Sequence, residues 1–429
     1  MTRVGEGQGT QTSAVPPRFA VASPLDVRRL AAQLDLVPQS GQSVPAGHGG
    51  HSVTELVVAL AGLVDHLDLI TLDPELSDPV ELRGPGVRLA VGPFRPRART
   101  RSRDLFSLER SFVAERIRTW QPDVVSAHWT YEYALGSLQS GRPTLTTVRD
   151  WAPTILWHER DPYRVVRLLM QLMTFSRGRN FAAVSPYMAH KVQRFTRRPC
   201  AVLPNGLGGH WFAGASPALA GHRVLAANAG FGRRKNVQQL LVAWPTVLKA
   251  LPDAELTLAG DGYETGGPAH RWAQRRGLLA GVRFVGPVNR SELRTLMGAC
   301  SVFAHPSLEE SFGMVVLEAM AVGVPVLGGH RSGAVPWLLA DGAGLVVDVR
   351  RPSTIAQGLL RLLTDIPFAE LTALRGHDRA SDRFDVNQVA SSYVETLATL
   401  AIQAQGVKVR DRPRWRQKVA CRKLKGRSV

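Results

Sequence analysis

Short runs of aliphatic and β-branched residues recur along the chain, and longer stretches with a helix-like pattern separate them. This alternation is typical of βαβ units, in which helices cover both faces of a parallel sheet. The runs form two series, which predict two doubly wound α/β domains. The predicted strands are 18–22, 69–72, 123–127, 144–148, 182–184 and 201–203 in the first series, and 224–227, 255–259, 283–285, 301–304, 325–327 and 345–347 in the second.

The segment 203–222, which is rich in Gly and Pro, separates the two series of strands. We therefore expect one Rossmann-like domain over residues 17–205 and another over 206–380, with a ligand-binding cleft between the carboxyl ends of their strands. Residues 1–16 are predicted to be loosely ordered. Residues 381–406 are predicted to form a helix that packs back on the first domain, and residues 407–429 form a basic tail.

The composition predicts a soluble globular protein, with 44% hydrophobic and 21% charged residues. No apolar run reaches the roughly 18 residues that a membrane-spanning helix needs. The first twenty residues also lack the apolar core of a secretory signal. These features predict a cytoplasmic location. The cysteines, Cys200, Cys300 and Cys421, are too few and too widely spaced for a disulfide framework or a metal knuckle.

The formal charge of +18 is unevenly distributed. From Lys408 to Val429 the chain carries ten Lys and Arg against one Asp, so about half of the excess lies in this tail, and the rest is only mildly basic. The tail is equally compatible with binding to an anionic membrane and with a solvated end. Nucleic acid is a weaker alternative, because no recognised binding motif accompanies the charge.

One stretch, EESFGMVVLEAMAVG, places Glu310 on a loop and Glu318 in a predicted helix at 314–321. Gly313 would let the backbone approach a ligand, and the first amides of the helix would bind an anion. A carboxylate at Glu318, among aliphatic neighbours, needs hydrogen bonds. A sugar or ribose hydroxyl would supply them, and so would a nearby backbone amide or arginine.

Two further stretches follow a predicted strand or precede a helix. Arg233, Arg234 and Lys235 form either a diphosphate site or a solvated basic turn. Near the amino end, a glycine loop containing Gly49 and Gly50 precedes a helix that Ser52 and Glu55 are predicted to cap in the S-x-x-E pattern. The loop could let a substrate approach the backbone. With no carboxylate partner visible, the adjacent His48 and His51 are interpreted as loop histidines.

Aromatic and charged residues also follow two strands of the first domain, where they would suit the apolar faces and hydroxyls of a sugar. His128 and Trp129 follow one strand, and Arg149, Asp150 and Trp151 follow the next. The alternative is ordinary packing of the tryptophans with a salt bridge between Arg149 and Asp150.

Taken in order, these stretches resemble the retaining glycosyltransferases of family 4, which have the GT-B fold of two Rossmann-like domains. Glu310 and Glu318 match the family's E-x7-E motif. LPNG at 203–206 is similar to the interdomain hinge, and VRFVGPVNRSEL at 282–293 is similar to the segment whose backbone near Val288 contacts the nucleobase. The resemblance extends over most of the chain.

The resemblance implies a nucleoside diphosphate sugar as donor, a glycan or lipid-linked acceptor, and a role in cell-surface polysaccharide or glycolipid biosynthesis. Glu310 would contact the donor sugar, Glu318 the ribose and Lys235 the phosphate. No metal or cofactor is expected, because cations and a helix end can neutralise the leaving diphosphate. The implied catalytic residues are Glu310, Lys235, Arg233 and Arg149. The implied donor-binding residues are Gly49, Gly50, Arg234, Val288, Ser311, Phe312, Gly313, Met314, Val315 and Glu318. The implied acceptor-side residues are His128, Trp129, Asp150 and Trp151.

The chain departs from the family at T-x-H-D, which here reads Thr147, Val148, Arg149, Asp150. Arginine cannot act as a base at neutral pH, so Arg149 can only bind or orient. This departure favours a second hypothesis, a noncatalytic sugar-nucleotide-binding component of a glycan assembly system. A sugar-nucleotide epimerase is a third, although E-x7-E together with LPNG is not expected there.

Overall fold

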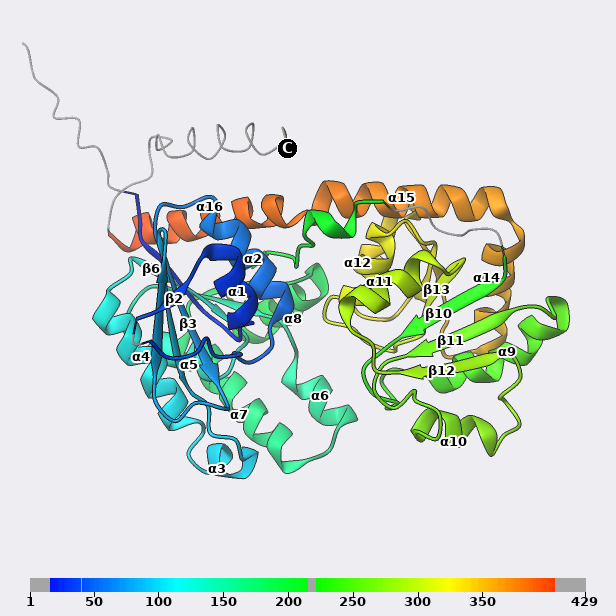
Figure 1. The fold of residues 1–429 in the computed structure, drawn as a ribbon, viewed down its shortest axis with the longest axis horizontal. Helices are drawn as coiled ribbons and strands as arrows, with labels where there is room; N and C mark the ends of the chain where they lie inside the picture. Colours follow the sequence, from blue (N-terminus) through cyan, green and yellow to red (C-terminus); the bar gives the residue numbers. More distant parts are fainter. Residues whose placement is uncertain (1–15, 40, 215–220, 406–429) are drawn as a thin grey trace, which may run out of the picture.

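The computed structural model describes residues 16–39, 41–214 and 221–405. Two α/β domains lie side by side, each with a central sheet between helices (Figure 1). The prediction of two doubly wound domains is therefore confirmed. The predicted basic tail and nearly all of residues 1–16 lie outside the described residues. No helix within the described ranges is long and apolar enough to cross a bilayer.

The first domain's sheet, as far as it is described, has the strand order β2-β4-β5-β3-β1-β6-β7-β8-β9. The β2–β4 and β4–β5 pairs are antiparallel and the other pairs are parallel. The strands are β1 Phe19–Ala22, β2 Val37–Pro38, β3 Leu67–Asp73, β4 Val80–Gly84, β5 Val87–Pro93, β6 Val124–His128, β7 Thr144–Val148, β8 Asn180–Ala183 and β9 Cys200–Val202.

The sequence pattern missed β2, β4 and β5, which form one edge of the first sheet and include its antiparallel pairs. Polar residues such as Glu81, Arg83 and Arg88 interrupt the apolar runs of the β4–β5 hairpin, because this edge is only partly buried. An antiparallel hairpin needs no crossover helix, so the strands follow each other too closely for the βαβ pattern.

The second domain's sheet has the order β12-β11-β10-β13-β14-β15, and its described strand pairs are all parallel. Each of its predicted strands is found within two residues of the predicted position. The strands are β10 Arg223–Ala227, β11 Glu255–Ala259, β12 Val282–Gly286, β13 Val302–His305, β14 Val326–Gly329 and β15 Leu345–Val347.

Helices cover both sheets and shield apolar strands that would otherwise be exposed to water. In the first domain they are α1 Val27–Leu34, α2 His51–Ala61, α3 Ala98–Arg103, α4 Ser107–Trp120, α5 Glu132–Gln139, α6 Ala152–His158, α7 Pro162–Arg177 and α8 Pro186–Thr196. After a short linker helix, Gly209–Trp211, follow α9 Val237–Ala250, α10 Pro268–Gln274, α11 Arg290–Gly298, α12 Met314–Ala321, α13 Val335–Leu338, α14 Pro352–Thr364, α15 Ile366–Phe384 and α16 Val386–Ala404.

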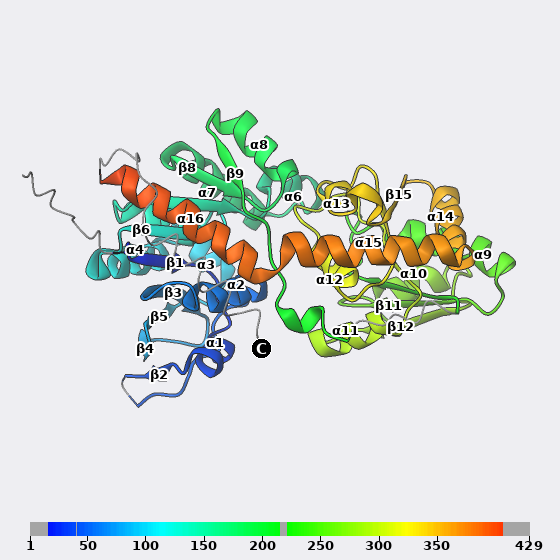
Figure 2. The same cartoon turned by 90° about the horizontal axis from the view of Figure 1, so that it is seen from above.

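The last two helices connect the second domain back to the first. Figure 2 shows α15 and α16 as one orange band along the molecule. Asp385 lies between them and caps α16 through its side chain. Here the chain also meets the linker, because Leu207 N donates to Phe384 O at 2.8 Å and Val386 N donates to Leu207 O at 2.9 Å. The two crossings between the domains are thus hydrogen-bonded to each other.

Helix α16 packs on α2 and β6 through a buried apolar face. Tyr393 is fully buried at the centre of this contact, with its ring centroid 5.7 Å from that of His128. Its hydroxyl lies 3.5 Å from Thr147 Oγ1.

We expect Tyr393→Ala to lower the free energy of unfolding of the first domain by about 3 kcal/mol, because the large cavity it leaves cannot collapse fully. Glu395→Ala, at an exposed position of the same helix, is the control and should change stability by less than about 0.5 kcal/mol. Thermal unfolding followed by circular dichroism measures both. Equal effects would show that α16 does not stabilise the first domain.

Candidate active site

Glu310 lies on the loop between β13 and α12, at the carboxyl edge of the second sheet. Its Oε1 accepts a hydrogen bond from Lys235 Nζ at 2.6 Å and lies 3.4 Å from His305 Nε2. Arg234 Nη1 is 3.8 Å from the other carboxylate oxygen. Burial alone would raise the pKa of Glu310, but His305, Lys235 and Arg234 together hold that pKa well below its usual value. Glu310 is therefore a carboxylate at neutral pH.

Two loops meet at Glu310 because Asn236 joins them. Its side-chain nitrogen donates to Pro306 O at 3.0 Å and to Val349 O at 2.8 Å. Leu308 N also donates to Arg234 O at 2.8 Å. The structure thus brings the predicted phosphate cations Arg234 and Lys235 to the loop of Glu310. Arg233 is exposed on the same turn.

Helix α12 begins where the sequence predicted, after Gly313 with φ 100°. This left-handed conformation favours glycine, and it leaves the first amides of the helix without helical partners. Ser311, Met314 and Val315 lie around this helix start. Phe312 differs, because its side chain is buried against Trp337 and Phe384. Only the backbone of Phe312 is therefore placed to meet a ligand. Val288 is partly buried and packs against the same core.

Glu318 is buried in α12 and its partner is an arginine, one of the alternatives left open by the sequence. Arg290 Nη2 donates to Glu318 Oε1 at 2.7 Å. Burial raises the pKa of Glu318, and Arg290 offsets only part of that rise. Arg290 is the first residue of α11 and follows Val288 closely in the chain. The ribose role of Glu318 stays a prediction.

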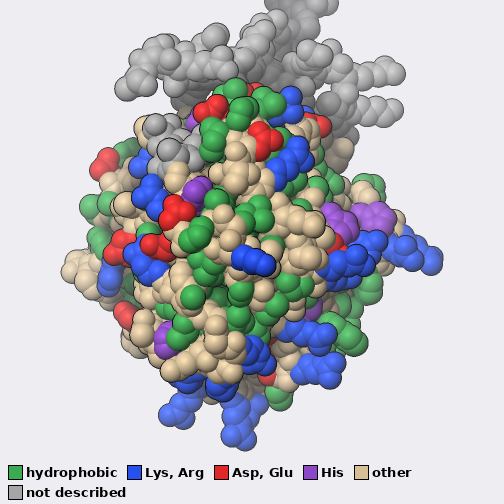
Figure 3. All heavy atoms as spheres, turned by 90° about the vertical axis from the view of Figure 1, so that its right-hand side faces the viewer, with side chains coloured by type: hydrophobic (Ala, Val, Ile, Leu, Met, Phe, Trp, Pro, Cys, Tyr) green, Lys and Arg blue, Asp and Glu red, His purple; other side chains and the backbone are tan. Residues whose placement is uncertain are grey.

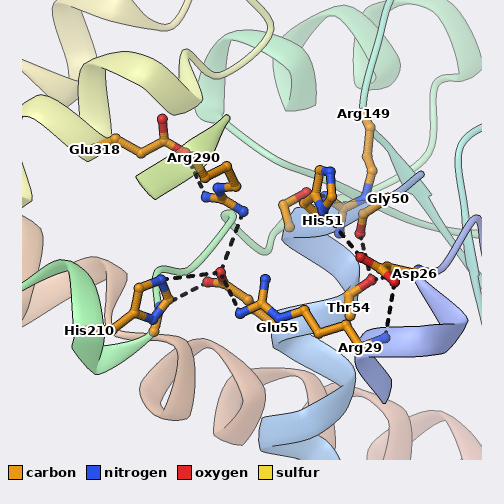
Figure 4. A network of polar contacts seen from close by, with 12 residues as sticks. Asp26, Arg29, Gly50, His51, Thr54, Glu55, Arg149, His210, Arg290 and Glu318 are labelled. Atoms are coloured by element: carbon orange, nitrogen blue, oxygen red, sulfur yellow. Dashed lines mark hydrogen bonds and ion pairs between the residues drawn. The ribbon is translucent and has the colours of Figure 1, made fainter. Parts of the chain in front are cut away.

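Glu55 of α2 connects this pair to the first domain (Figure 4). Its Oε1 lies 3.4 Å from Arg290 Nη1 and 3.3 Å from Arg29 Nη2. Its Oε2 accepts a hydrogen bond from Gly208 N, in the linker, at 2.9 Å. Arg290 therefore lies between two buried carboxylates that belong to different domains. Sequence reasoning missed Arg290 altogether.

The predicted capping role of Ser52 and Glu55 is wrong. Helix α2 begins at His51, its N-cap is Gly50, and no side chain caps it. Gly50 has φ 81°, and a Cβ there would lie 2.0 Å from Pro24 O, so the loop admits only glycine. Glu55 instead faces the second domain. A single acid within the apolar run VTELVVALA was the signal for this role.

Of the two predicted loop histidines, His48 lies in the loop, whereas His51 is the first residue of α2. His48 stacks against Phe94 with ring centroids 4.8 Å apart, and burial lowers its pKa. His51 has a carboxylate partner that the sequence did not reveal, since its Nδ1 lies 3.8 Å from Asp26 Oδ2. Gly49 has open space where a side chain would stand. The part of the loop that can admit a substrate is thus Gly49.

A second set of contacts joins the domains next to Glu310. Tyr187 OH and Lys191 Nζ, both on α8, donate to Glu309 Oε1 at 2.6 Å and 2.8 Å. Ser185 Oγ donates to Ser311 O at 2.6 Å. The loop that carries Glu310 is therefore held by the first domain. No sequence motif pointed to Glu309, because Glu310 alone matched the family pattern.

Arg149 is buried at the end of β7 and donates hydrogen bonds to neutral groups. Its Nε donates to His128 Nδ1 at 3.0 Å, and its Nη1 donates to the linker residue Asn205 and, at 3.4 Å, to Ser52 Oγ. The guanidinium also lies 5.3 Å from the ring centroid of Trp129. Arg149 thus joins the start of α2 to the linker, and these contacts are compatible with the predicted orienting role.

The alternative salt bridge between Arg149 and Asp150 is not formed. Asp150 accepts a hydrogen bond from Tyr131 OH at 2.9 Å, and burial raises its pKa. His128 is fully buried, and burial followed by the charge of Arg149 lowers its pKa, so it is neutral. Trp151 is partly buried and packs against Phe175. Within the described parts of the chain, no group of three or more His, Cys, Asp and Glu side chains could hold a metal ion.

Two family models match the chain in succession. The model described as Glycosyltransferase Family 4 matches residues 49–207, and the one described as Glycosyl transferases group 1 matches residues 220–373. The chain belongs to the family 4 and group 1 glycosyltransferases. Its linker, with Gly208 and the short helix Gly209–Trp211, falls at the junction of the two matches.

Curated members of this glycosyltransferase group are similar to part of the chain. It is 32% identical over 214 residues to the phosphatidyl-myo-inositol mannosyltransferase of Mycobacterium leprae, covering 48% of this chain and 55% of that protein. It is 30% identical over 177 residues to a lipopolysaccharide core biosynthesis glycosyltransferase of Rhizobium meliloti, covering 41% of this chain and 50% of that protein. The chain thus spans about half the length of these relatives.

Solved structures of glycosyltransferases share the fold. Sucrose-phosphate synthase from Thermosynechococcus elongatus has a TM-score of 0.69 at 20% identity, covering 90% of this chain and 99% of that one. HepE from Anabaena, in complex with UDP-glucose, has a TM-score of 0.62 at 19% identity, covering 89% and 100%. Likeness at this identity shows the fold alone, and the predicted GT-B class is confirmed.

Arg290→Met should reveal the energetic role of the shared arginine in this glycosyltransferase. It leaves Glu55 and Glu318 buried without their common cation, so we expect a loss of about 3 kcal/mol in the free energy of unfolding at neutral pH. A raised pKa means that the folded state binds the proton more tightly. Stability therefore falls as pH rises above the ordinary pKa of glutamate, and the variant should fall more steeply than the parent.

Urea unfolding at several pH values between about 5 and 8 measures this slope. Arg275→Met, at an exposed position of the second domain, is the control. If Arg290→Met and Arg275→Met gave the same pH dependence, the paired carboxylates would not depend on Arg290.

Proposed function

We propose that the chain transfers a sugar, of the hexose class, from a nucleoside diphosphate sugar to a glycan or lipid-linked acceptor. The observation that supports this most directly is the ionised Glu310 among Lys235, Arg234 and His305, beside the free amides at the start of α12. A carboxylate beside cations can accept hydrogen bonds from sugar hydroxyls while the cations hold the attached diphosphate.

The leaving group would be stabilised by this chain's own charges. As the bond between the anomeric carbon and the diphosphate oxygen breaks, negative charge develops on that oxygen. Lys235, Arg234 and the first amides of α12 would neutralise it, so the proposed reaction needs no metal. Lys235 would then divide its hydrogen bonds between Glu310 and the diphosphate. Arg233 is close enough in the chain to add a further cation.

Retention would follow if the acceptor attacks from the side on which the diphosphate leaves. The acceptor oxygen forms the new bond to the anomeric carbon, and its proton passes to the departing phosphate oxygen. No nucleophilic side chain is needed for this step. A general base at Arg149 is not needed either, and this agrees with the orienting contacts of that residue.

The relatives support the acceptor class. One is a phosphatidyl-myo-inositol mannosyltransferase and another acts in lipopolysaccharide core biosynthesis, while a structural neighbour binds UDP-glucose. We therefore propose cell-surface glycan or glycolipid biosynthesis as the setting. His128 is too deeply buried to contact an acceptor directly, whereas Trp129 and Trp151 are partly exposed.

A noncatalytic sugar-nucleotide-binding component is the second candidate, because Arg149 replaces the family's histidine. A panel of nucleoside diphosphate sugars, with release of nucleoside diphosphate as the readout, separates the two. Turnover with any donor supports the enzyme. Saturable binding without turnover, with glycan and lipid-linked acceptors present, would establish the noncatalytic candidate.

Glu310→Gln removes the charge but keeps the side-chain size. We expect transfer to fall by about a hundredfold or more, as for other groups that act on the transition state. Affinity for the nucleoside diphosphate should be kept or increased, because Lys235 and Arg234 lose a competing anion. Glu292→Gln is a matched control, since glutamine preserves the capping box of α11. Unchanged turnover in Glu310→Gln would remove Glu310 from the site.

A further inference from the structure

The segment 95–103, RPRARTRSR, has an arginine at every second position, and two of its arginines are used within the fold. Arg95 pairs with Asp104 at 2.9 Å and with Glu109 at 2.7 Å. Arg101 is buried, donates to the carbonyl of Arg95 and lies 4.1 Å from the ring centroid of Phe94. These contacts fix α3 against the first domain.

The other three arginines of this segment point to water. Arg97, Arg99 and Arg103 are exposed, and none of them makes an ion pair with a described residue. The two acids that follow them, Asp104 and Glu109, are already paired with Arg95. Helix α3 thus presents three uncompensated positive charges.

Next to α3, the hairpin of α6 and α7 exposes large apolar side chains. Trp157 is 70% exposed and Leu169 is 47% exposed. Val165, Leu169 and Leu172 are spaced four and three residues apart, so they form one stripe along α7. Leu108, just after α3, is 62% exposed. Such a cluster is costly to leave in water and is typical of an interaction surface.

The charged and apolar parts lie on neighbouring elements of the first domain. Helices α3 and α7 are in contact, and the rings of Phe106 and Tyr163 beside them are 6.4 Å apart. Figure 1 shows α3, α6 and α7 along the lower edge of the first domain. Figure 3 faces the opposite end of the molecule, formed by the second domain, where Lys and Arg side chains are also exposed.

The other charged residues of the α6–α7 hairpin do not cancel the positive charge near α3. Glu159 and Asp161 both pair with Arg164, at 2.5 Å and 3.6 Å. Arg160 makes no ion pair with a described residue and lies 5.3 Å from the ring centroid of Trp157. We name as the arginine-rich face the exposed side chains of Arg97, Arg99, Arg103, Leu108, Trp157, Arg160, Val165, Leu169 and Leu172.

We propose that the arginine-rich face docks on an anionic lipid bilayer. The partner must be negatively charged and must also accept leucine and tryptophan side chains. A phospholipid headgroup layer offers both properties, because arginines reach its phosphates while their stems and the apolar stripe enter the acyl boundary. Nucleic acid would satisfy the arginines but would leave Leu169 and Leu172 in water.

The face borders the candidate active site at two points. Thr154 of α6 accepts a hydrogen bond from Lys191 at 3.3 Å, and the same lysine holds Glu309. At the other end, Arg101 stacks on Phe94, which packs against His48 of the glycine loop. A lipid-linked acceptor in the docked bilayer would therefore meet the acceptor side of the site. This last step rests on the proposed function, whereas docking itself does not.

Cosedimentation with phosphatidylcholine vesicles, with and without phosphatidylglycerol, tests the docking. The full chain should bind only the anionic vesicles. Replacing Arg97, Arg99 and Arg103 together by Gln should weaken binding about a hundredfold, since each arginine near an anionic surface contributes about fivefold. The matched control replaces three exposed arginines of other surfaces, Arg28, Arg350 and Arg383, by Gln. Equal losses in the two triples would overturn the proposal, because they would show a response to net charge alone.

A second pair of variants tests the apolar stripe. Trp157→Ser with Leu169→Ser should weaken vesicle binding by about tenfold or more. Leu371→Ser with Leu374→Ser removes two leucines of α15 that are 45% and 58% exposed, and it should have no effect. The proposal would fail if the arginine substitutions alone weakened vesicle binding and duplex DNA displaced the vesicles in competition. The occupant of the face would then be nucleic acid.

A full-length variant with every Lys and Arg of the basic tail replaced by Gln separates the two candidate membrane contacts. The arginine-rich face should retain binding to anionic vesicles in this variant, and complete loss would overturn the proposal. Release of nucleoside diphosphate with a soluble acceptor should be unchanged in the Arg97, Arg99 and Arg103 triple. Docking without turnover would refute the proposed function and leave the docking surface standing.

Discussion

A carboxylate that is buried away from water needs a nearby cation, and this requirement determines how the side chains between the two domains are arranged. Glu55, Glu310 and Glu318 are all largely buried. Lys235 pairs with Glu310 from the neighbouring loop, and Arg290 pairs with both Glu55 and Glu318. Unpaired, each would cost several kcal/mol. The loops that form the candidate donor site are therefore fixed by the charges that they must bring together.

The same requirement couples the domains. Arg290 belongs to the second domain and Glu55 to the first, while Glu309 of the second domain receives Tyr187 and Lys191 from the first. These polar groups therefore receive partners from both domains. The position of the Glu310 loop consequently depends on how the first domain sits, so an acceptor bound there could influence the donor site through direct contacts.

The parallel strands and helix α12 could be predicted because their signals are local. An apolar run between turn residues defines a buried strand, and Gly313 marks the start of α12. The contact between Glu55 and Arg290 could not be predicted, because it joins residues 235 positions apart. Glu55 was assigned to a helix cap because a local rule fitted it. The chemistry of arginine limits Arg149 to binding or orienting, but its partner Asn205 could not be predicted because it is far away in the chain.

The hydrogen bonds that tie the linker to the α15–α16 junction place both crossings of the chain at one edge. Two connections at one edge define a hinge axis between the domains. Rotation of the domains about this axis would keep these hydrogen bonds, whereas sliding one domain past the other would break them. Opening of the two domains would then widen the space between them most on the side away from the axis, where a bulky molecule needs room to enter. On closing, each loop would return to the same partner. The fixed axis would therefore restore the same arrangement of the two domains at each closure.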